Sequence, residues 1–89
     1  MRVPMTRPKM PPQAAQEFGR RVRTRRHELG LSQEGLAEGT ALHWSFIGRI
    51  ERGQANLTLR NILRLAEVLD VDPADLVRGL RSDWVKLIH

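Results

Sequence analysis

The chain has 89 residues, a formal net charge of +5 at pH 7 and no cysteine, and hydrophobic residues make up 40% of it. This length supports one domain with one small core, and a deep substrate cavity would consume most of that core, so an enzyme is not expected. Without cysteine, neither a disulfide framework nor a thiolate metal site is available.

Membrane insertion and secretion are not indicated either. The sequence has no run of the about 20 apolar residues that a bilayer requires. Its start, Met1-Arg2-Val3-Pro4, lacks the apolar stretch of a signal peptide. We therefore expect a soluble cytoplasmic protein with no membrane partner.

The positive charge is concentrated before residue 61. Residues 1–60 hold eleven basic and five acidic side chains, a balance of +6, whereas residues 61–89 hold four basic and five acidic ones, a balance of −1. A one-sided positive field attracts polyanions and speeds their capture. An ordinary solvated basic surface explains the same count, so charge alone leaves nucleic-acid binding open.

Residues 1–13 are predicted to form a flexible basic arm. They hold four of the five prolines, with Arg2, Arg7 and Lys9 between them. Proline lacks an amide hydrogen and disfavours helix in the residue before it. The arm could reach along a DNA backbone or into a minor groove, and a disordered tail without a partner is the plainer alternative.

Residues 14–80 are predicted to form an all-α domain of five helices, since no strand pattern of any length appears. The first helix begins at Ala14 and ends at Gly30, a residue that readily takes the positive φ of a helix end. Apolar residues recur along it at helical spacing: Phe18, Val22 and Leu29.

Two short helices follow, joined by a tight turn at residues 38–41. Ser32 caps the first of them, because its hydroxyl can accept a hydrogen bond from a free amide of the first turn. The second begins near His43 and ends at Gly53. The inward positions of this pair are apolar and small enough to let the helices cross: Leu36, Ala37, Ile47 and Ile50.

Two further helices complete the predicted domain. Thr58 caps the fourth, and Asp72 and Pro73 supply the cap and the first helical position of the fifth. A broad apolar face is expected along the fourth helix: Leu59, Ile62, Leu63, Leu65, Ala66 and Leu69.

The second and third helices have the arrangement of a helix-turn-helix, two short helices joined by a short turn with basic flanks. In this motif the first helix lies across the phosphate backbone and the second enters the major groove. The outward face of the second offers side chains that can touch base edges: His43 at the cap, then Trp44, Ser45, Gly48 and Arg49. Double-stranded DNA is therefore the predicted partner.

Three motifs follow one another in this region. They are Gly30-Leu31-Ser32-Gln33-Glu34, then Leu36-Ala37, then Ile47-Gly48-Arg49-Ile50-Glu51-Arg52-Gly53. Together they resemble the phage repressor/Cro-type (XRE) family of helix-turn-helix domains over roughly residues 17–80. Leu42-His43, the motif ending at Gly53 and Asn56-Leu57-Thr58-Leu59 are also similar to the controller proteins of restriction–modification systems.

The resemblance implies roles for particular side chains. Base reading is implied for His43, Trp44, Ser45 and Arg49. Contacts with DNA phosphates are implied for Gln33, Arg52, Asn56, Arg60 and Asn61. Arg26 and Glu51 match positions that pair with each other, so Arg26 is assigned to structure. An arginine that grips guanine O6 and N7 contributes about 1–3 kcal/mol of discrimination. A cap-only role for His43 and a core position for Trp44 are the plainer alternatives.

Two positions depart from the family pattern or weaken a helix. Ala41 occupies a turn position where the family usually has glycine, and a left-handed conformation there would cost about 1–2 kcal/mol. Gly39 offers the turn another path. Gly48 weakens a short helix, and on the recognition face it would allow close approach to DNA.

A C-terminal apolar stripe predicts a dimer interface. Its members are Leu76, Val77, Leu80, Trp84, Leu87 and Ile88. One small chain does not readily cover so much apolar surface, and such patches usually mark interfaces. Gly79 and Ser82-Asp83 can divide the stripe, so residues 81–89 are treated as an apolar tail with the option of an extra helical segment. A two-fold dimer would place two recognition helices ~34 Å apart, on an inverted repeat.

The leading hypothesis is a dimeric, sequence-specific transcriptional regulator that represses, activates or does both, with RNA polymerase as a further candidate partner. The alternative is an antitoxin that sequesters a toxin and autoregulates its operon. A third hypothesis, a small hydrolase, is not supported, because the sequence offers no set of nucleophile and base. The three histidines lack metal-ligand spacing, so no metal or cofactor is expected.

Overall fold

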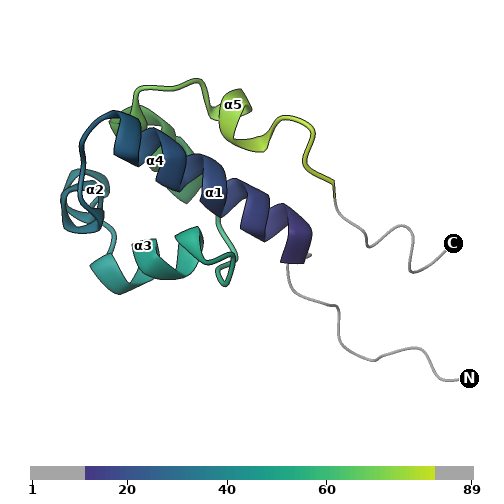
Figure 1. Ribbon diagram of the computed structural model, residues 1–89, viewed down its shortest axis with the longest axis horizontal. Coiled ribbons are helices and arrows are strands. Elements are labelled where there is room, and N and C mark those ends of the chain that lie inside the picture. Colours follow the sequence, from purple (N-terminus) through teal and green to yellow (C-terminus); the bar gives the residue numbers. More distant parts are fainter. Residues whose placement is uncertain (1–11, 82–89) are drawn as a thin grey trace, which may run out of the picture.

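The computed structural model describes residues 12–81 and is all-helical throughout that range (Figure 1). Its elements are α1 (Pro12–Glu28), α2 (Gln33–Thr40), α3 (Trp44–Glu51), α4 (Leu59–Leu69) and α5 (Pro73–Val77). The predicted all-α, five-helix fold is confirmed. The first helix begins two residues earlier than expected, because proline is well accepted at a first helical position. The remainder of the predicted arm and tail lies outside the described residues.

The predicted caps set three of the helix starts. The hydroxyl of Ser32 accepts a hydrogen bond from the amide of Gly35 at 2.9 Å. Thr58 does the same for the amide of Asn61 at 3.1 Å, and a carboxylate oxygen of Asp72 accepts from the amide of Ala74 at 2.8 Å. Each bond satisfies an amide that has no partner inside its helix.

The turn between α2 and α3 is shorter than the sequence predicted. Residues 38–40 belong to the last turn of α2, and Ala41 alone takes the left-handed conformation, with φ of 59°. The alternative path through Gly39 is not used. A Cβ at Gly39 would lie 3.0 Å from Cγ1 of Val68, so this glycine lets α2 pack closely against α4.

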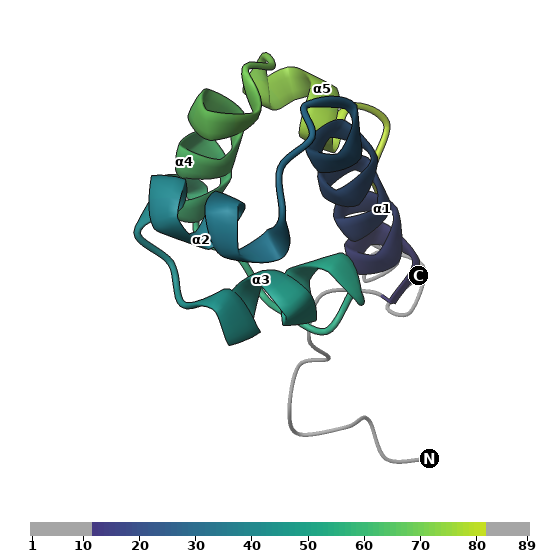
Figure 2. The same cartoon turned by 60° about the vertical axis from the view of Figure 1, so that its left-hand side comes forward.

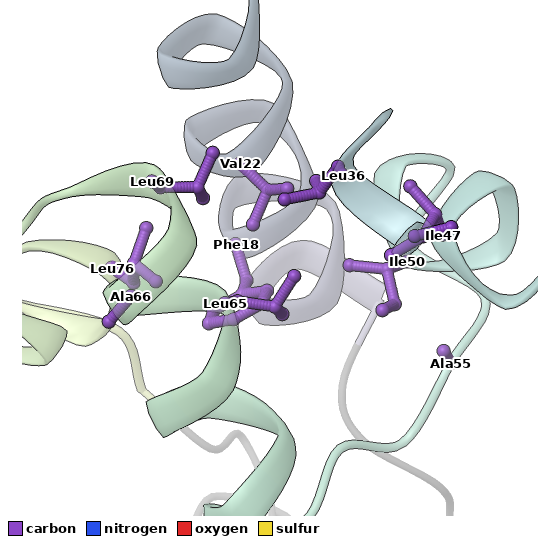
Figure 3. Close-up of a cluster of buried hydrophobic side chains, with 11 residues drawn as sticks. Phe18, Val22, Leu36, Ile47, Ile50, Ala55, Leu65, Ala66, Leu69 and Leu76 are labelled. Carbon is purple, nitrogen blue, oxygen red and sulfur yellow. The ribbon is translucent and has the colours of Figure 1, made fainter. Parts of the chain in front are cut away.

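The core lies where the five helices meet (Figure 3). Phe18 and Val22 of α1 face Leu65 and Leu69 of α4 across its centre. Side chains of the other helices close it on either side: Leu36, Ile47, Ile50 and Leu76. Full burial of one such side chain contributes roughly 1.5–3 kcal/mol. The inner face of the helix-turn-helix is thus an integral part of the only core found in the described chain.

Several apolar residues do not lie where the sequence placed them. Leu59 is 70% exposed and Leu63 42% exposed, because the buried stripe of α4 is centred on Leu65 and Leu69 and these two residues lie at its edge. Leu29 follows the end of α1 and is 39% exposed. Leu76, predicted for a dimer interface, is instead 2% exposed in the core of its own chain.

Two arginines of α1 attach the C-terminal helices. Nε of Arg25 donates to the carbonyl of Leu69 at 2.8 Å, and Nη1 of Arg21 donates to the carbonyl of Leu76 at 3.3 Å. A cation at a helix C-terminus satisfies free carbonyls and the helix dipole together. Arg20 and Arg21 also donate to Glu17, which lowers the pKa of that carboxyl to about 2. Part of the basic charge of α1 is therefore used within the fold.

The left-handed residue at the end of α2 gives a first prediction. Ala41→Gly is expected to raise the free energy of unfolding by up to about 1 kcal/mol, because the relieved Cβ strain of about 1–2 kcal/mol exceeds the entropy that glycine adds to the unfolded chain. Urea titration measures the change. Ala74→Gly, inside a helix with ordinary φ, serves as the control and is expected to lose about 0.5–1 kcal/mol. A loss of stability in Ala41→Gly would contradict the strain argument.

Candidate nucleic-acid interface

Helix α3 lies along one edge of the molecule, with α2 packed on its inner side (Figure 2). Ile47 and Ile50 point into the core and are 0% and 1% exposed. No other described helix covers the outer side of α3. Helix α3 therefore contributes to the core on its inner side and leaves its outer side free.

The first turn of α3 exposes an aromatic pair. Trp44 is 60% exposed, so its alternative placement in the core is wrong. Its ring stacks on that of His43, with the centroids 5.7 Å apart. Nδ1 of His43 accepts a hydrogen bond from the amide of Ser45 at 3.1 Å and lies 2.7 Å from the hydroxyl of Ser45. Because Nδ1 accepts, the neutral ring carries its proton on Nε2 as a donor. His43 is thus the helix cap, and its reading of a base stays a prediction.

Two exposed arginines, Arg49 in the last turn of α3 and Arg52 directly after it, donate to the same loop residue, Gln54. Nη2 of Arg49 donates to the backbone carbonyl of Gln54 at 3.3 Å, and its guanidinium lies 5.9 Å from the ring centroid of Phe46. Nε of Arg52 donates to the side-chain oxygen of Gln54 at 3.2 Å. Sequence reasoning did not single out Gln54. The available signal was its place directly after Gly53, which ends the helix with φ of 73°.

Gly48 was expected to be an open position on the outward face of the recognition helix. It is buried, and a Cβ at this position would lie 3.0 Å from Nη1 of Arg52. The arginine side chain folds back by one turn and covers the glycine. Gly48 therefore faces the outer side of α3 but is not open there, because Arg52 covers it.

The pair expected between Arg26 and Glu51 is present and ties α1 to the end of α3. Nε and Nη2 of Arg26 donate to the two carboxylate oxygens of Glu51 at 2.7 and 3.0 Å, and the side chains are 9% and 4% exposed. These hydrogen bonds raise the pKa of Arg26. Arg26 also donates to the carbonyl of Leu31 at 2.9 Å, just before α2.

Gln33, the first residue of α2, joins the same network. Its side-chain amide donates to Oε1 of Glu51 at 3.1 Å. One carboxylate thus holds the start of α2, the body of α1 and the end of α3. The half-buried Gln33 is fixed at a helix N-terminus, where backbone amides and the dipole favour an anion. Its contact with a DNA phosphate stays a prediction.

The remaining candidates for phosphate contact follow α3 in the chain. Asn56 and Arg60 are exposed, and Asn61 is half-buried at the start of α4. Thr58 caps that helix between them. The structure therefore places these three residues in the loop and first helical turn directly after α3.

The sequence matches a family model described as "Helix-turn-helix domain" over residues 17–79. The chain belongs to the helix-turn-helix family. Its relatives are DNA-binding transcriptional regulators, and the predicted phage repressor-type family is confirmed.

Three relatives illustrate the match. This helix-turn-helix protein is 43% identical to Control protein C.BamHI of Bacillus amyloliquefaciens over 61 residues, which is 67% of this chain and 75% of that protein. It superposes on the restriction-modification controller protein C.AhdI from Aeromonas hydrophila with a TM-score of 0.68 and 48% identity, over 70% of this chain and 94% of that one. The P22 c2 repressor, solved with a synthetic operator, gives a TM-score of 0.67 and 30% identity over 72% and 97% of the two chains.

These relatives are regulators and not enzymes. Between residues 12 and 81, no helix of this helix-turn-helix protein is both long and apolar enough to cross a bilayer. Within the same range, no three histidine or acidic side chains gather as a metal site would require.

Breaking the buried pair gives a second prediction. Glu51→Gln preserves size but leaves the charge of Arg26 uncompensated, so the free energy of unfolding should fall by about 3–5 kcal/mol, measured by urea titration. Glu17→Gln is the matched control, because Glu17 also accepts from two arginines but its side chain is 33% exposed, against 4% for Glu51. Its loss should be much smaller. Equal losses of unfolding free energy in the two variants would show that burial does not make the Arg26–Glu51 pair more important for stability than a surface pair.

Proposed function

We propose that this regulator binds an inverted-repeat operator as a symmetric dimer, with α3 of each subunit in the major groove. The observation that carries the proposal is the exposed face of α3, where Trp44 is 60% exposed in the first helical turn. A tryptophan this exposed beside hydrogen-bonding groups is unusual on a surface that binds no partner and typical of a binding surface. The N-terminal residues of a recognition helix are those that touch base edges.

The chemistry of that face fits duplex DNA. Arg49 offers Nε and Nη1, which donate no other hydrogen bond within the described chain, to guanine O6 and N7. Ser45 can donate to or accept from several bases. Trp44 supplies an apolar surface for thymine methyl groups or sugar edges. This face therefore combines one strongly selective group with two permissive ones.

Phosphate contacts on both sides of α3 would set its register. Gln33 and the free amides of the first turn of α2 are suited to one phosphate. Asn56, Arg60 and Asn61 follow α3 and are suited to others, as is Arg52 at its end. Contacts of this kind orient a protein on the duplex without reading sequence.

Apolar surface near the C-terminus supports the dimer. Val77 is 40% exposed at the end of α5, and Leu80 is half-buried against the core. The other expected interface residues, Trp84, Leu87 and Ile88, lie outside the described residues. A two-fold pair would bring two copies of α3 onto half-sites one helical turn apart.

We further propose that the regulated genes encode a restriction–modification pair. Two of its relatives are named as a control protein and as a restriction-modification controller, at 43% and 48% identity. Neighbouring reading frames provide the check. A nuclease and a DNA methyltransferase beside this gene support the assignment, and a small toxin gene would favour the antitoxin alternative instead.

Selection of sites from random duplex DNA tests the operator proposal. The wild type should select an inverted repeat, and Arg49→Ala should lose preference at one base-pair position in each half-site, a change worth about 1–3 kcal/mol. Arg78→Ala is the control, because it removes the same charge after α5, on the opposite side of the molecule from α3 (Figure 2). Uniform weakening by Arg49→Ala would make Arg49 a phosphate contact. No selected sequence with the wild type would reject the proposal.

Sedimentation tests the dimer. The wild type should be a dimer at micromolar concentration, and Val77→Asp should weaken association by at least about tenfold, because a charge would enter an apolar interface. Leu29→Asp is the control, since Leu29 is 39% exposed, almost as much as Val77, but lies at the end of α1. A monomeric wild type would contradict the dimer, and an equal response of both variants would remove Val77 from the interface.

A further inference from the structure

A glycine in the middle of α3 accommodates an arginine side chain. Gly48 follows Trp44 by four residues and Ser45 by three, so it lies on the same side of the helix as these exposed residues. It is nevertheless buried, because Arg52 covers it: a Cβ would lie 3.0 Å from Nη1 and 3.8 Å from Cζ of that arginine. Arg52 itself is exposed. The missing side chain makes room for the guanidinium.

Gln54 holds the same guanidinium by a hydrogen bond. Its Oε1 accepts from Nε of Arg52 at 3.2 Å, and its backbone carbonyl accepts from Nη2 of Arg49 at 3.3 Å. The amide of Gln54 donates to the carbonyl of Arg49 at 2.8 Å, directly after the helix-ending Gly53. The loop residue is thus fixed by the backbone and contacts both exposed arginines.

The arrangement leaves the ends of Arg52 available. Within residues 12–81, Nη1 and Nη2 of Arg52 donate no hydrogen bond. They lie over Gly48 and not out beyond the end of the helix, so they are on the side of α3 that carries Trp44 and Ser45. An arginine already held in one conformation loses less entropy when it binds.

We propose that Gly48 and Gln54 are positioning residues that hold Arg52 along the exposed side of α3, ready to contact DNA. The inference rests on the proposed function of α3 as the DNA-binding helix. On this view, position 48 is a glycine because Arg52 needs the space, and not because the helix backbone must approach the duplex closely. The two explanations predict different effects of Gly48→Ala on DNA binding when Arg52 is absent.

A double-mutant cycle separates them, using the operator that the wild type selects. Gly48→Ala should weaken binding by about tenfold, the loss expected for one charge-assisted hydrogen bond. In an Arg52→Ala background the same substitution should have no further effect. A loss of the same size in both backgrounds would mean that the added methyl group meets DNA directly, and no loss in either would mean that Arg52 needs no such room. Both results would overturn the proposal.

Folding is not expected to obscure this test. The crowded atoms belong to the far end of a flexible side chain, and alanine favours helix over glycine, so the thermal midpoint of Gly48→Ala should not fall. A lower midpoint would overturn the view that only the arginine end must move.

A measurement on the free protein keeps this inference distinct from the proposed function. The Nε–H resonance of Arg52 in ¹⁵N-labelled protein should shift in Gly48→Ala and in Gln54→Met, which removes the acceptor but retains the length of the side chain. Gln54→Glu retains an acceptor and should restore a hydrogen-bonded resonance. An unchanged resonance in the first two variants would overturn the positioning roles, whereas a wild type without an operator would overturn only the proposed function.

Discussion

The arrangement of the helix-turn-helix depends on one buried carboxylate. Glu51 accepts hydrogen bonds from Arg26 on α1 and from Gln33 at the start of α2, while its own backbone ends α3. Burying such a charge is costly unless every partner is in place, so the network penalises any other arrangement of the three helices. The close contact of Gly19 with the backbone of Ile50 and Glu51 adds to this constraint, because any side chain there would separate α1 from α3.

Fixing the end of α3 from inside the molecule frees its outer side for other contacts. Ile47 and Ile50 are used by the core, and the polar groups that orient the helix lie beneath it. The exposed face can then carry Trp44 and Arg49, neither of which belongs to the core. This division lets the reading residues vary while the helix keeps its position, which is what sequence-specific binding requires of a scaffold.

The structure also separates apolar residues that look equivalent in sequence. Leu65 and Leu59 lie on the same helix and fit the same periodic pattern, yet one is fully buried and the other is 70% exposed. Leu76 and Val77 are neighbours in the predicted dimer stripe, but only Val77 remains available to a partner. Periodicity gives the direction of a side chain around its helix, and the width of the buried stripe depends on which helices cover it.

The sequence by itself determined the five helices, their capping residues, the family resemblance and the candidate pair of Arg26 and Glu51. The helices and caps follow from local chemistry, because caps, helix-ending glycines and apolar spacing act within a few residues, whereas the pair of Arg26 and Glu51 was implied by the family resemblance. Only the tertiary structure decided that Ala41 is left-handed, that Arg52 folds back over Gly48 and that Gln54 contacts two arginines. Those outcomes depend on how the chain turns at the ends of α2 and α3, where packing between helices sets the backbone and residue spacing alone does not.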